Sequence, residues 1–212
     1  MKKVVILGDS GHSKVISDLI YSTEGMLLTA KLDDRYNEAF VREGVTKGPI
    51  RYLRQLLQEE PDICVVFGIG SNTVRKKLVK ELGLPRTSFI TLIHPTAVIS
   101  PSAVIGLGTV VMPRVVVNAD STIGDHAILN TGSIIEHDCK IADYAHISPQ
   151  AILAGGVEVG EGAHVGAGAS VIPLKTVGEW STIGAGAAVV YNIPGNVTAV
   201  GVPAKEIRKE GI

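Results

Sequence analysis

The chain has 212 residues, 45% of them hydrophobic, and a formal net charge of −1 at pH 7. This length suits one domain of ordinary size and a smaller one. Because the charge is almost balanced, we expect neither nucleic acid nor an anionic membrane as a partner. No run of about 20 apolar residues and no signal-peptide pattern is seen, so we expect a cytoplasmic protein without membrane contact.

Strand and helix patterns alternate over the first part of the chain. Apolar runs predict strands, and helical spacing of apolar residues predicts helices. This alternation predicts a small α/β domain with a Rossmann-like parallel sheet over residues 1–88, with ligands bound beyond the carboxyl ends of its strands. The expected strands are 2–7, 27–32 and 63–67, and the expected helices are 13–21, 51–59 and 74–84.

The first loop of this domain is its best candidate for ligand binding. It reads Gly8-Asp9-Ser10-Gly11-His12 and joins the first strand to the first helix. Glycines there allow backbone amides to approach a phosphate at the helix N-terminus, although a plain structural turn has the same residues. The string Gly-Asp-Ser-Gly also occurs around the nucleophile of trypsin-like proteases. Its place after the first strand of an α/β domain argues against that reading.

Two further segments lie at the same predicted edge. Asp33 and Asp34 follow the second strand, where carboxylates accept hydrogen bonds from a ribose, a base or a sugar amine. A solvated pair of loop residues is the alternative. A second glycine turn, 68–72, follows the third strand.

From Ile93 to Val189, every sixth residue is aliphatic. Four residues after each aliphatic position the chain usually has Ala or Ser, so each six-residue side supplies one bulky and one small inward side chain. Such a period predicts a parallel β-helix with three sides and 18 residues per coil, here assigned to residues 89–192. The small residues are Ala97, Ala103, Ser121, Ala127, Ser133, Ala145, Ala151, Ala163, Ala169, Ser181 and Ala187.

Polar residues interrupt this repeat at Glu136-His137-Asp138. His137 is two residues after an inward Ile and is therefore expected to face outward, with a carboxylate beside it. An imidazole oriented by a carboxylate is typical of a general base, whereas a lone surface histidine is usually inert. His146 is half a coil further on, so the two histidines can share a site only across a subunit interface. His164, one full coil after His146, should stack on it, for ligand contact or for packing.

The remaining features are the two cysteines and the C-terminal segment. Cys64 lies in an apolar run and Cys139 in the small inward column, so we expect both to be reduced core residues without a disulfide or a metal. The residues 193–196 end the repeat. The segment 193–212 then contains a basic tail, which we expect to be helical over 201–208.

Several of these motifs together resemble those of the NeuD/PglD-type sugar O- and N-acyltransferases. They are Val-Ile-Leu-Gly-x-x-Gly-His at the start, Asp33-Asp34, Ile-Glu-His-Asp at 135–138, His146-Ile-Ser and the closing Gly-Val-Pro-Ala-Lys. The resemblance covers essentially the whole chain. It implies a left-handed β-helix, a homotrimer, a nucleotide-sugar site in the first domain and acetyl-CoA in the groove between neighbouring β-helices.

The resemblance also implies roles for individual residues. His137 corresponds to the catalytic base and Asp138 to its orienting acid, although relatives often have Glu there. His146 and Gly155 match positions near the thioester, with the Gly155 amide as a donor to the oxyanion. The other implied contacts are Ala167 and Ala185 with the pantetheine arm, and Gly8, Gly11, His12, Asp33 and Asp34 with the sugar nucleotide. Lys205 and Arg208 are candidates for contact with the coenzyme phosphates, and a solvated tail is the alternative for them.

The function implied is acetyl-CoA-dependent N-acetylation of a nucleotide-linked amino sugar, with 4-amino-4,6-dideoxy sugars favoured, in surface-glycan biosynthesis. We expect the amine to attack the thioester directly with His137 as general base, and we expect no metal. O-acetylation of a sialic acid or a similar sugar fits the same motifs. Two other classes fit less well: a γ-type carbonic anhydrase, whose zinc histidines have different spacings, and a non-catalytic solenoid that binds a sugar nucleotide.

Overall fold

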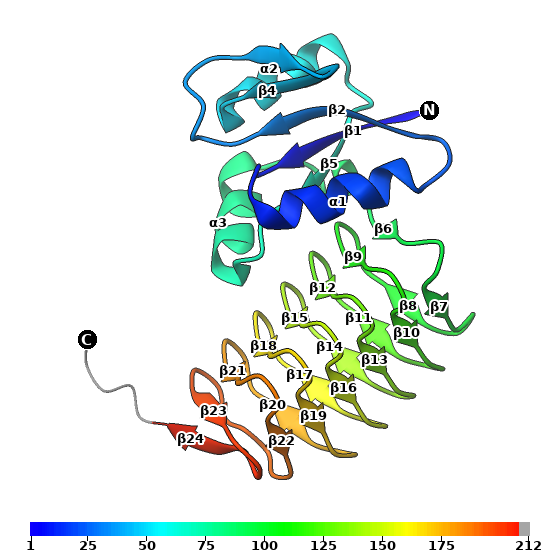
Figure 1. Ribbon diagram of the computed structural model, residues 1–212, viewed down its shortest axis with the longest axis vertical. Coiled ribbons are helices and arrows are strands. Elements are labelled where there is room, and N and C mark those ends of the chain that lie inside the picture. Colours follow the sequence, from blue (N-terminus) through cyan, green and yellow to red (C-terminus); the bar gives the residue numbers. More distant parts are fainter. Residues whose placement is uncertain (208–212) are drawn as a thin grey trace. The chain divides into compact units, whose positions relative to one another are not determined.

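The structure, a computed structural model, describes residues 1–207 (Figure 1). The chain forms two compact units, Met1–Leu92 and a second that begins at Ile93. The domain limits predicted from the sequence, at residues 88 and 192, remain predictions. Within the described residues, no helix combines the length and the apolar character needed to cross a membrane.

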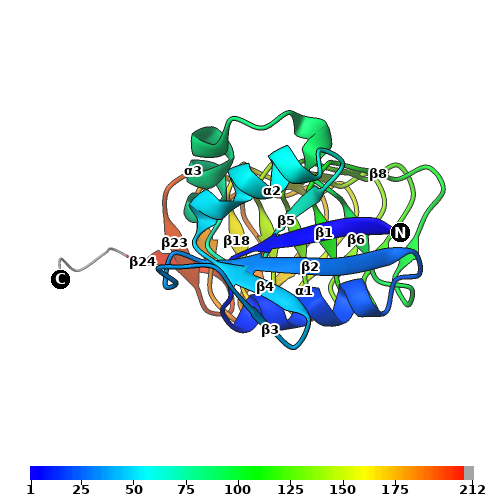
Figure 2. The same ribbon diagram turned by 90° about the horizontal axis from the view of Figure 1, so that it is seen from above.

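A five-stranded sheet forms the centre of the first unit, in the strand order β3-β4-β2-β1-β5. All strand pairs are parallel except β3 with β4. Helix α1 covers one face of the sheet, and α2 and α3 cover the other (Figure 2). The elements are β1 (Lys2–Leu7), α1 (Gly11–Tyr21), β2 (Met26–Leu32), β3 (Phe40–Arg42), β4 (Val45–Gly48), α2 (Leu53–Glu59), β5 (Cys64–Phe67), α3 (Asn72–Leu82) and the 3-10 helices η1 (Ile50–Tyr52) and η2 (Arg86–Ser88).

Residues 4–7 of β1 and 65–67 of β5 are buried on both faces of the sheet, which explains the unbroken apolar runs there. Val5 and Leu7 of β1, Leu32 of β2 and Phe67 of β5 pack with Leu53 of α2 in one apolar core. Removing such side chains from water is the main stabilising contribution in a domain of this kind. The carboxyl ends of β1, β2 and β5 thereby become fixed at one edge of the sheet.

The sequence did not reveal the hairpin β3–β4. Its turn is made by Glu43 and Gly44, both with positive φ values of 53° and 76°. Two such residues in succession suit the tight turns that match the twist of a hairpin. The hairpin was missed because all three residues of β3 are exposed, so no apolar alternation marks it.

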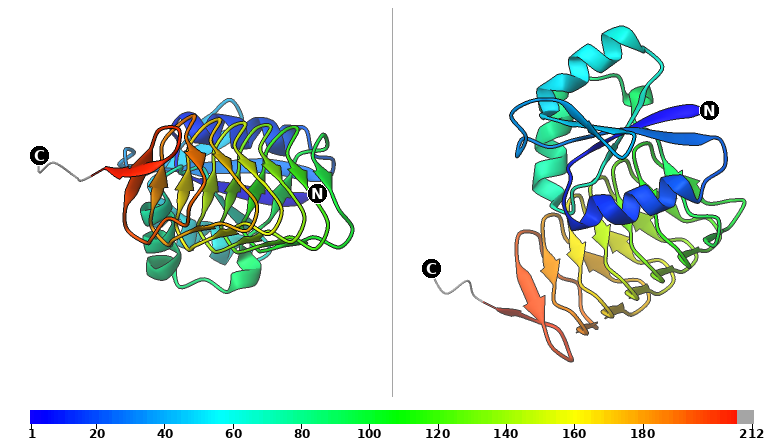
Figure 3. Two further views of the ribbon diagram at one scale, coloured as in Figure 1. Left: turned by 90° about the horizontal axis from the view of Figure 1, so that it is seen from below. Right: turned by 45° about the horizontal axis from the view of Figure 1, so that its top comes forward.

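Three sheets form the second unit, a parallel β-helix in which each coil adds one strand to each sheet (Figure 3, left). The first sheet, called here the β7 sheet, consists of β7 (Val98–Ile99), β10 (Val116–Val117), β13 (Ile134–Ile135), β16 (Ile152–Leu153), β19 (Ser170–Val171) and β22 (Ala188–Val189). The β8 sheet consists of β8 (Val104–Ile105), β11 (Thr122–Ile123), β14 (Lys140–Ile141), β17 (Glu158–Val159) and β20 (Thr176–Val177). The β6 sheet consists of β6 (Leu92–Ile93), β9 (Val110–Val111), β12 (Ile128–Leu129), β15 (His146–Ile147), β18 (His164–Val165), β21 (Thr182–Ile183), β23 (Thr198–Val200) and β24 (Lys205–Ile207).

Successive coils stack in register. Ile135, for example, pairs with Leu153 of the next coil, and Leu153 pairs with Val171. The aliphatic column is buried from Val111 to Val189, and the Ala and Ser column lies beside it in the interior. Because the register repeats every coil, the position of each outward side chain follows from its number.

The C-terminal part differs from the expectation of a helix over 201–208. Lys205–Ile207 form a strand that pairs antiparallel with β23. The edge of β23 would otherwise have unpaired backbone N–H and C=O groups. The chain turns back after residue 204, and Lys205–Ile207 form hydrogen bonds with these groups. Arg208, named above as a phosphate contact, lies outside the described residues.

Candidate functional site

His137 and Asp138 occupy the turn between β13 and β14. The imidazole donates from Nδ1 to Oδ2 of Asp138 at 2.7 Å, and both side chains are exposed. This hydrogen bond to a carboxylate raises the pKa of His137 above its ordinary value. With Nδ1 engaged as the donor, Nε2 is the nitrogen left to accept a proton. The pair therefore has the arrangement of a general base.

Gly155 provides the space in which the imidazole lies. It is one coil beyond His137, and the neighbouring amide of Gly156 donates to the carbonyl of His137 at 2.9 Å. A Cβ atom on Gly155 would stand 2.6 Å from both Cε1 and Nε2 of His137. Any larger residue at this position would therefore displace the ring.

The coil before His137 anchors this turn. Ser121 donates to the carbonyl of Glu136 at 2.7 Å, and the Asn118 amide donates to the Glu136 carboxylate at 2.8 Å. From the sequence we did not name Asn118, and we named Ser121 only as a small inward residue, although their distance of about one coil from Glu136 was a usable signal. Cys139 points inward as expected, and burial raises the pKa of its thiol. It is unsuited to act as a nucleophile.

A second group of predicted residues lies on the β6 sheet. The rings of His146 and His164 stack in parallel with centroids 4.7 Å apart. Nε2 of His146 lies 3.1 Å from the Asn130 amide, so it is the acceptor and the proton is on Nδ1. Ala167 and Ala185, exposed and one coil apart, follow β18 and β21 in the turns that leave this sheet. The predicted thioester and pantetheine contacts thus fall into two groups, Gly155 with His137 and the others on a different side of the coil.

Lys205 lies on the same sheet as His146 but at its C-terminal end. It is exposed on β24. Its proposed contact with coenzyme phosphates remains a prediction.

The first loop of the α/β unit is shaped by close packing. Gly8 has a φ of 101°, and a Cβ atom there would stand 2.6 Å from Ile69 of the second glycine turn. His12 is largely buried, and burial together with the nearby Arg75 lowers its pKa to about 4. Its imidazole is therefore neutral at pH 7. In contrast, a Cβ atom on Gly11 would meet no atom within 4 Å, so packing inside the unit does not require a glycine there.

Asp33 and Asp34 bind backbone amides of their own domain. The Asp33 carboxylate accepts from Asp9 N at 2.8 Å and from Arg35 N at 3.0 Å. Burial alone would raise the pKa of Asp33, but these hydrogen bonds and the guanidinium of Arg35 outweigh it and leave the pKa below its ordinary value. Asp34 accepts from Ile50 N at 2.8 Å, at the start of η1. Both carboxylates therefore hold the loops at this edge of the sheet in place.

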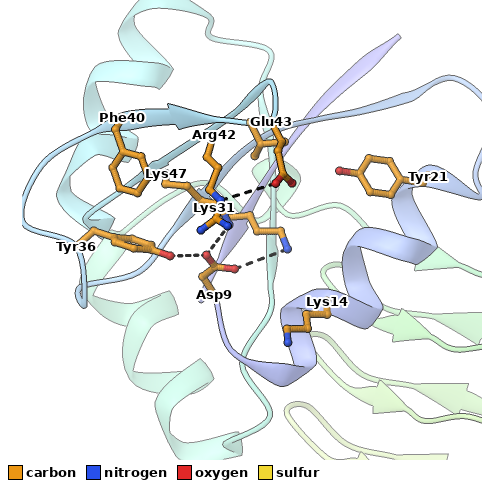
Figure 4. A pocket seen from close by; sticks show the side chains of 10 residues that line it. Asp9, Lys14, Tyr21, Lys31, Tyr36, Phe40, Arg42, Glu43 and Lys47 are labelled. Atoms are coloured by element: carbon orange, nitrogen blue, oxygen red, sulfur yellow. Dashed lines mark hydrogen bonds and ion pairs between the residues drawn. The ribbon is translucent and has the colours of Figure 1, made fainter.

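A cavity of about 500 Å³ lies beside this loop, and we call it the Asp9 cavity (Figure 4). The Asp9 carboxylate accepts from Tyr36 Oη at 2.7 Å and from Lys47 Nζ at 2.5 Å, and Lys31 Nζ is 3.7 Å away. We did not predict this cluster. Its signal was a lysine inside the apolar strand 27–32. The lining residues are Asp9, Lys14, Tyr21, Lys31, Tyr36, Phe40, Arg42, Glu43, Val45 and Lys47.

Comparison with known proteins adds independent evidence. The PglD N-terminal domain family matches residues 3–82, and the GMPPB C-terminal domain family matches residues 89–185. A mutant of perosamine N-acetyltransferase from Caulobacter crescentus, solved with CoA and GDP-perosamine, is 39% identical to this chain. The match covers 99% of this chain and 98% of that one, with a TM-score of 0.89. The chain belongs to the PglD-type family of sugar acyltransferases.

Two more similar proteins are acetyltransferases as well. The acetyltransferase domain of PglB from Neisseria gonorrhoeae FA1090, in complex with acetyl coenzyme A, is 35% identical. That match covers 97% of this chain and 99% of that one, with a TM-score of 0.88. UDP-N-acetylbacillosamine N-acetyltransferase of Bacillus subtilis (strain 168) is 49% identical over 112 residues, which are 53% of this chain and 52% of that protein. The chain thus spans about half the length of this curated relative.

Family membership confirms three predictions. The fold class, an α/β domain followed by a left-handed parallel β-helix, is confirmed by both units and their relatives. The class of enzyme, an acyltransferase, is confirmed by the acetyltransferases among them. The co-substrate is confirmed as well, since CoA or acetyl-CoA is the ligand of the related structures. The residue roles remain predictions.

Proposed function

We propose that the protein transfers the acetyl group of acetyl-CoA to the amine of a nucleotide-linked amino sugar. A 4-amino-4,6-dideoxy sugar of a surface-glycan pathway is our preferred substrate. The observation that carries the proposal is the His137–Asp138 pair seated on Gly155, in a chain whose relatives act on UDP- or GDP-linked amino sugars. The cytoplasmic location and the homotrimer predicted above are part of this proposal.

In the proposed reaction the amine attacks the thioester carbonyl and a C–N bond forms. Nε2 of His137 accepts the proton of the amine, and Asp138 stabilises the imidazolium. The C–S bond then breaks, and the CoA thiolate leaves and takes up the proton. In this proposal the Gly155 amide, for which no acceptor is seen within residues 1–207, donates to the oxyanion. No covalent acyl-enzyme is needed.

A homotrimer would bring the two groups of predicted residues together. His137 and Gly155 lie in the turns after strands of the β7 sheet, whereas His146 lies in the β6 sheet and Ala167 in a turn that leaves it. One copy cannot place both groups around one thioester, but two neighbouring copies can. Apolar side chains on the outward face of the β7 sheet support such an association, because exposed apolar patches often mark interfaces. They are Val98, Val116, Ile134 and Ile152.

The test is thiol release from acetyl-CoA with UDP-, dTDP- and GDP-linked 4-amino and 3-amino sugars. We expect turnover with one of these substrates and a loss of about 10²-fold or more in His137→Ala. His94→Ala, which removes another β-helix histidine, should retain activity. The product should resist hydroxylamine, as an amide does and an ester does not. Full activity of His137→Ala would refute its role, and a hydroxylamine-labile product would establish O-acetylation instead.

A further inference from the structure

The stacked rings of His146 and His164 have no role in the proposed reaction beyond the place of His146 near the thioester. The two residues are direct partners in the neighbouring strands β15 and β18, so their side chains leave the β6 sheet on the same face. Their rings are parallel within 2°, with centroids 4.7 Å apart. This separation matches the spacing of adjacent strands, so the two rings face each other with no group between them.

Each imidazole is also held at one edge by a polar side chain that lies 16 residues before it in the chain. Nε2 of His146 accepts from the Asn130 amide at 3.1 Å, and Nε2 of His164 lies 2.7 Å from Oγ of Ser148. Asn130 and Ser148 occupy the same position in consecutive coils. The same pair of a polar group and an imidazole therefore occurs twice along this face.

The second pair is the more firmly anchored one. Ser148 is only 5% exposed, whereas both imidazoles are half-buried. A buried hydroxyl keeps its hydrogen-bond partner, because leaving it unsatisfied is costly. The contact with Ser148 therefore fixes the ring of His164, and this ring forms a flat surface against His146.

Such a surface matters because an outward histidine can rotate about its side-chain torsions. Rotation changes whether Nδ1, Nε2 or a ring carbon meets a ligand. The hydrogen bond from Asn130 fixes one atom of the His146 ring but allows the ring to pivot about that atom. The parallel ring of His164 blocks this movement on one side. The two contacts together determine which atom of His146 meets a ligand.

We propose that His164, fixed by Ser148, is a positioning residue that holds the His146 ring in the orientation required to contact acetyl-CoA. His164 acts through His146 and takes no part in the chemistry itself. A small displacement of a group beside the reacting bond lowers the rate strongly, so the orientation of this ring affects turnover. This inference rests on the proposed function, in which His146 lies near the thioester, and deepens it.

Steady-state kinetics of the full-length enzyme, with acetyl-CoA as the varied substrate, test the inference. In His164→Ala we expect kcat/KM for acetyl-CoA to fall about 10-fold, while KM for the amino sugar stays unchanged. Ser148→Ala should cause part of this loss, about 3-fold. His164→Phe retains a flat ring against His146 and should stay within about 3-fold of the unmodified enzyme. Thr122→Ala, which removes an exposed outward side chain from the β8 sheet, should have no effect.

Two further measurements separate a positioning role from a purely structural one. In a His146→Ala background, His164→Ala should cause no further loss, because the ring that it positions is gone. Nitrogen NMR of the protein with isotope-labelled histidine reports the tautomer of His146 without any turnover. We expect the proton on Nδ1 in the unmodified protein and a mixture of both tautomers in His164→Ala.

Three results would each overturn the inference: an unchanged kcat/KM in His164→Ala, an equal loss in His164→Phe, or a full loss on top of His146→Ala. If His164→Ala fails to fold, Ser148→Ala keeps the test decisive, because it leaves the His164 ring and removes only its anchor. Calorimetric binding of CoA distinguishes this inference from the proposed function. Weaker CoA binding in His164→Ala, without acetylation of any amino sugar, would refute the proposed function alone. Acetylation with unchanged kinetics in His164→Ala would refute the role of His164 alone.

Discussion

In the β-helix, His137 lies against Gly155, the residue one coil further along the chain. In the α/β unit, Asp9 meets Asp33, Tyr36 and Lys47, which are 24 to 38 residues away along the chain. The first arrangement repeats a fixed register, and the second depends on how separate strands and loops meet. Neighbours can therefore be read from residue numbers in the β-helix, whereas in the α/β unit they require the structure.

The largest effect should come from breaking the repeated core. Leu153 is fully buried between Ile135 and Val171, so Leu153→Ala should lower the free energy of unfolding by about 2–5 kcal/mol. Urea unfolding followed by the fluorescence of Trp180, the one tryptophan of the chain, measures this change.

Leu174→Ala is the matched control, since Leu174 is 77% exposed in a turn of the same β-helix. It should change the stability by less than about 0.5 kcal/mol. Equal effects of the two substitutions would mean that the inward column does not determine the stability of the β-helix.

The sequence was sufficient to predict the fold of the β-helix because every coil packs the same kinds of side chain at the same positions. Its period identified the buried columns, the outward direction of His137 and the stacking of His146 on His164. It failed at the end of the repeat, where Lys205–Ile207 form a strand instead of a helix. Pairing with the edge of β23 determines the conformation of these residues, and the helical spacing of the local sequence gives no information on a strand earlier in the chain.

In the α/β unit, the sequence identified the buried strands and all three helices but few of the contacts between side chains. The hairpin around Glu43 was invisible because its strands are short and exposed. The backbone hydrogen bonds of Asp33 and Asp34, and the pairing of Lys31 with Lys47, arise from the register between separate strands and loops. No local pattern of residues encodes that register.

The two units should also respond differently to acid. The pKa of His12 in the folded protein is about 4, below the ordinary value of 6.5, so the unfolded chain binds the proton more tightly. This contribution to stability is complete above pH 6.5 and is lost as the pH falls towards 4, by up to about 3 kcal/mol. Hydrogen exchange of β1 amides at pH 7 and pH 5 should show the loss.

His12→Gln, which cannot titrate, should reduce this dependence on pH. The unfolding midpoint reported by Trp180 in the β-helix should be the same in both proteins at each pH. A pH dependence of the β1 amides that is unchanged in His12→Gln would show that His12 is not the group responsible.

A smaller effect, on activity, is expected at the contact between Gly155 and the His137 ring of the preceding coil. Gly155→Ala places a Cβ atom against the His137 ring, which is exposed and free to move aside, so activity should fall about 10-fold without loss of stability. A double-mutant cycle with His137→Ala tests the cause. In the His137→Ala background, Gly155→Ala should have little further effect, because the backbone amide is kept and no ring remains to be displaced. Additive losses would show that Gly155 acts independently of His137.

The smallest effect concerns the charge of Asp138. A general base acts in its neutral form, so kcat/KM should rise with pH through the pKa of His137, which Asp138 raises. Asp138→Asn keeps an acceptor for Nδ1 but removes the charge. The acidic limb of the pH profile should therefore move to lower pH, with a loss of less than about 10-fold at the plateau. Asp120→Asn, at the same turn position one coil earlier and with the same φ of 61°, should leave the limb unchanged. A limb that stays in place in Asp138→Asn would assign the titration to a group other than His137. The register of the coils would then predict where residues lie in the β-helix but not which residue acts as the base.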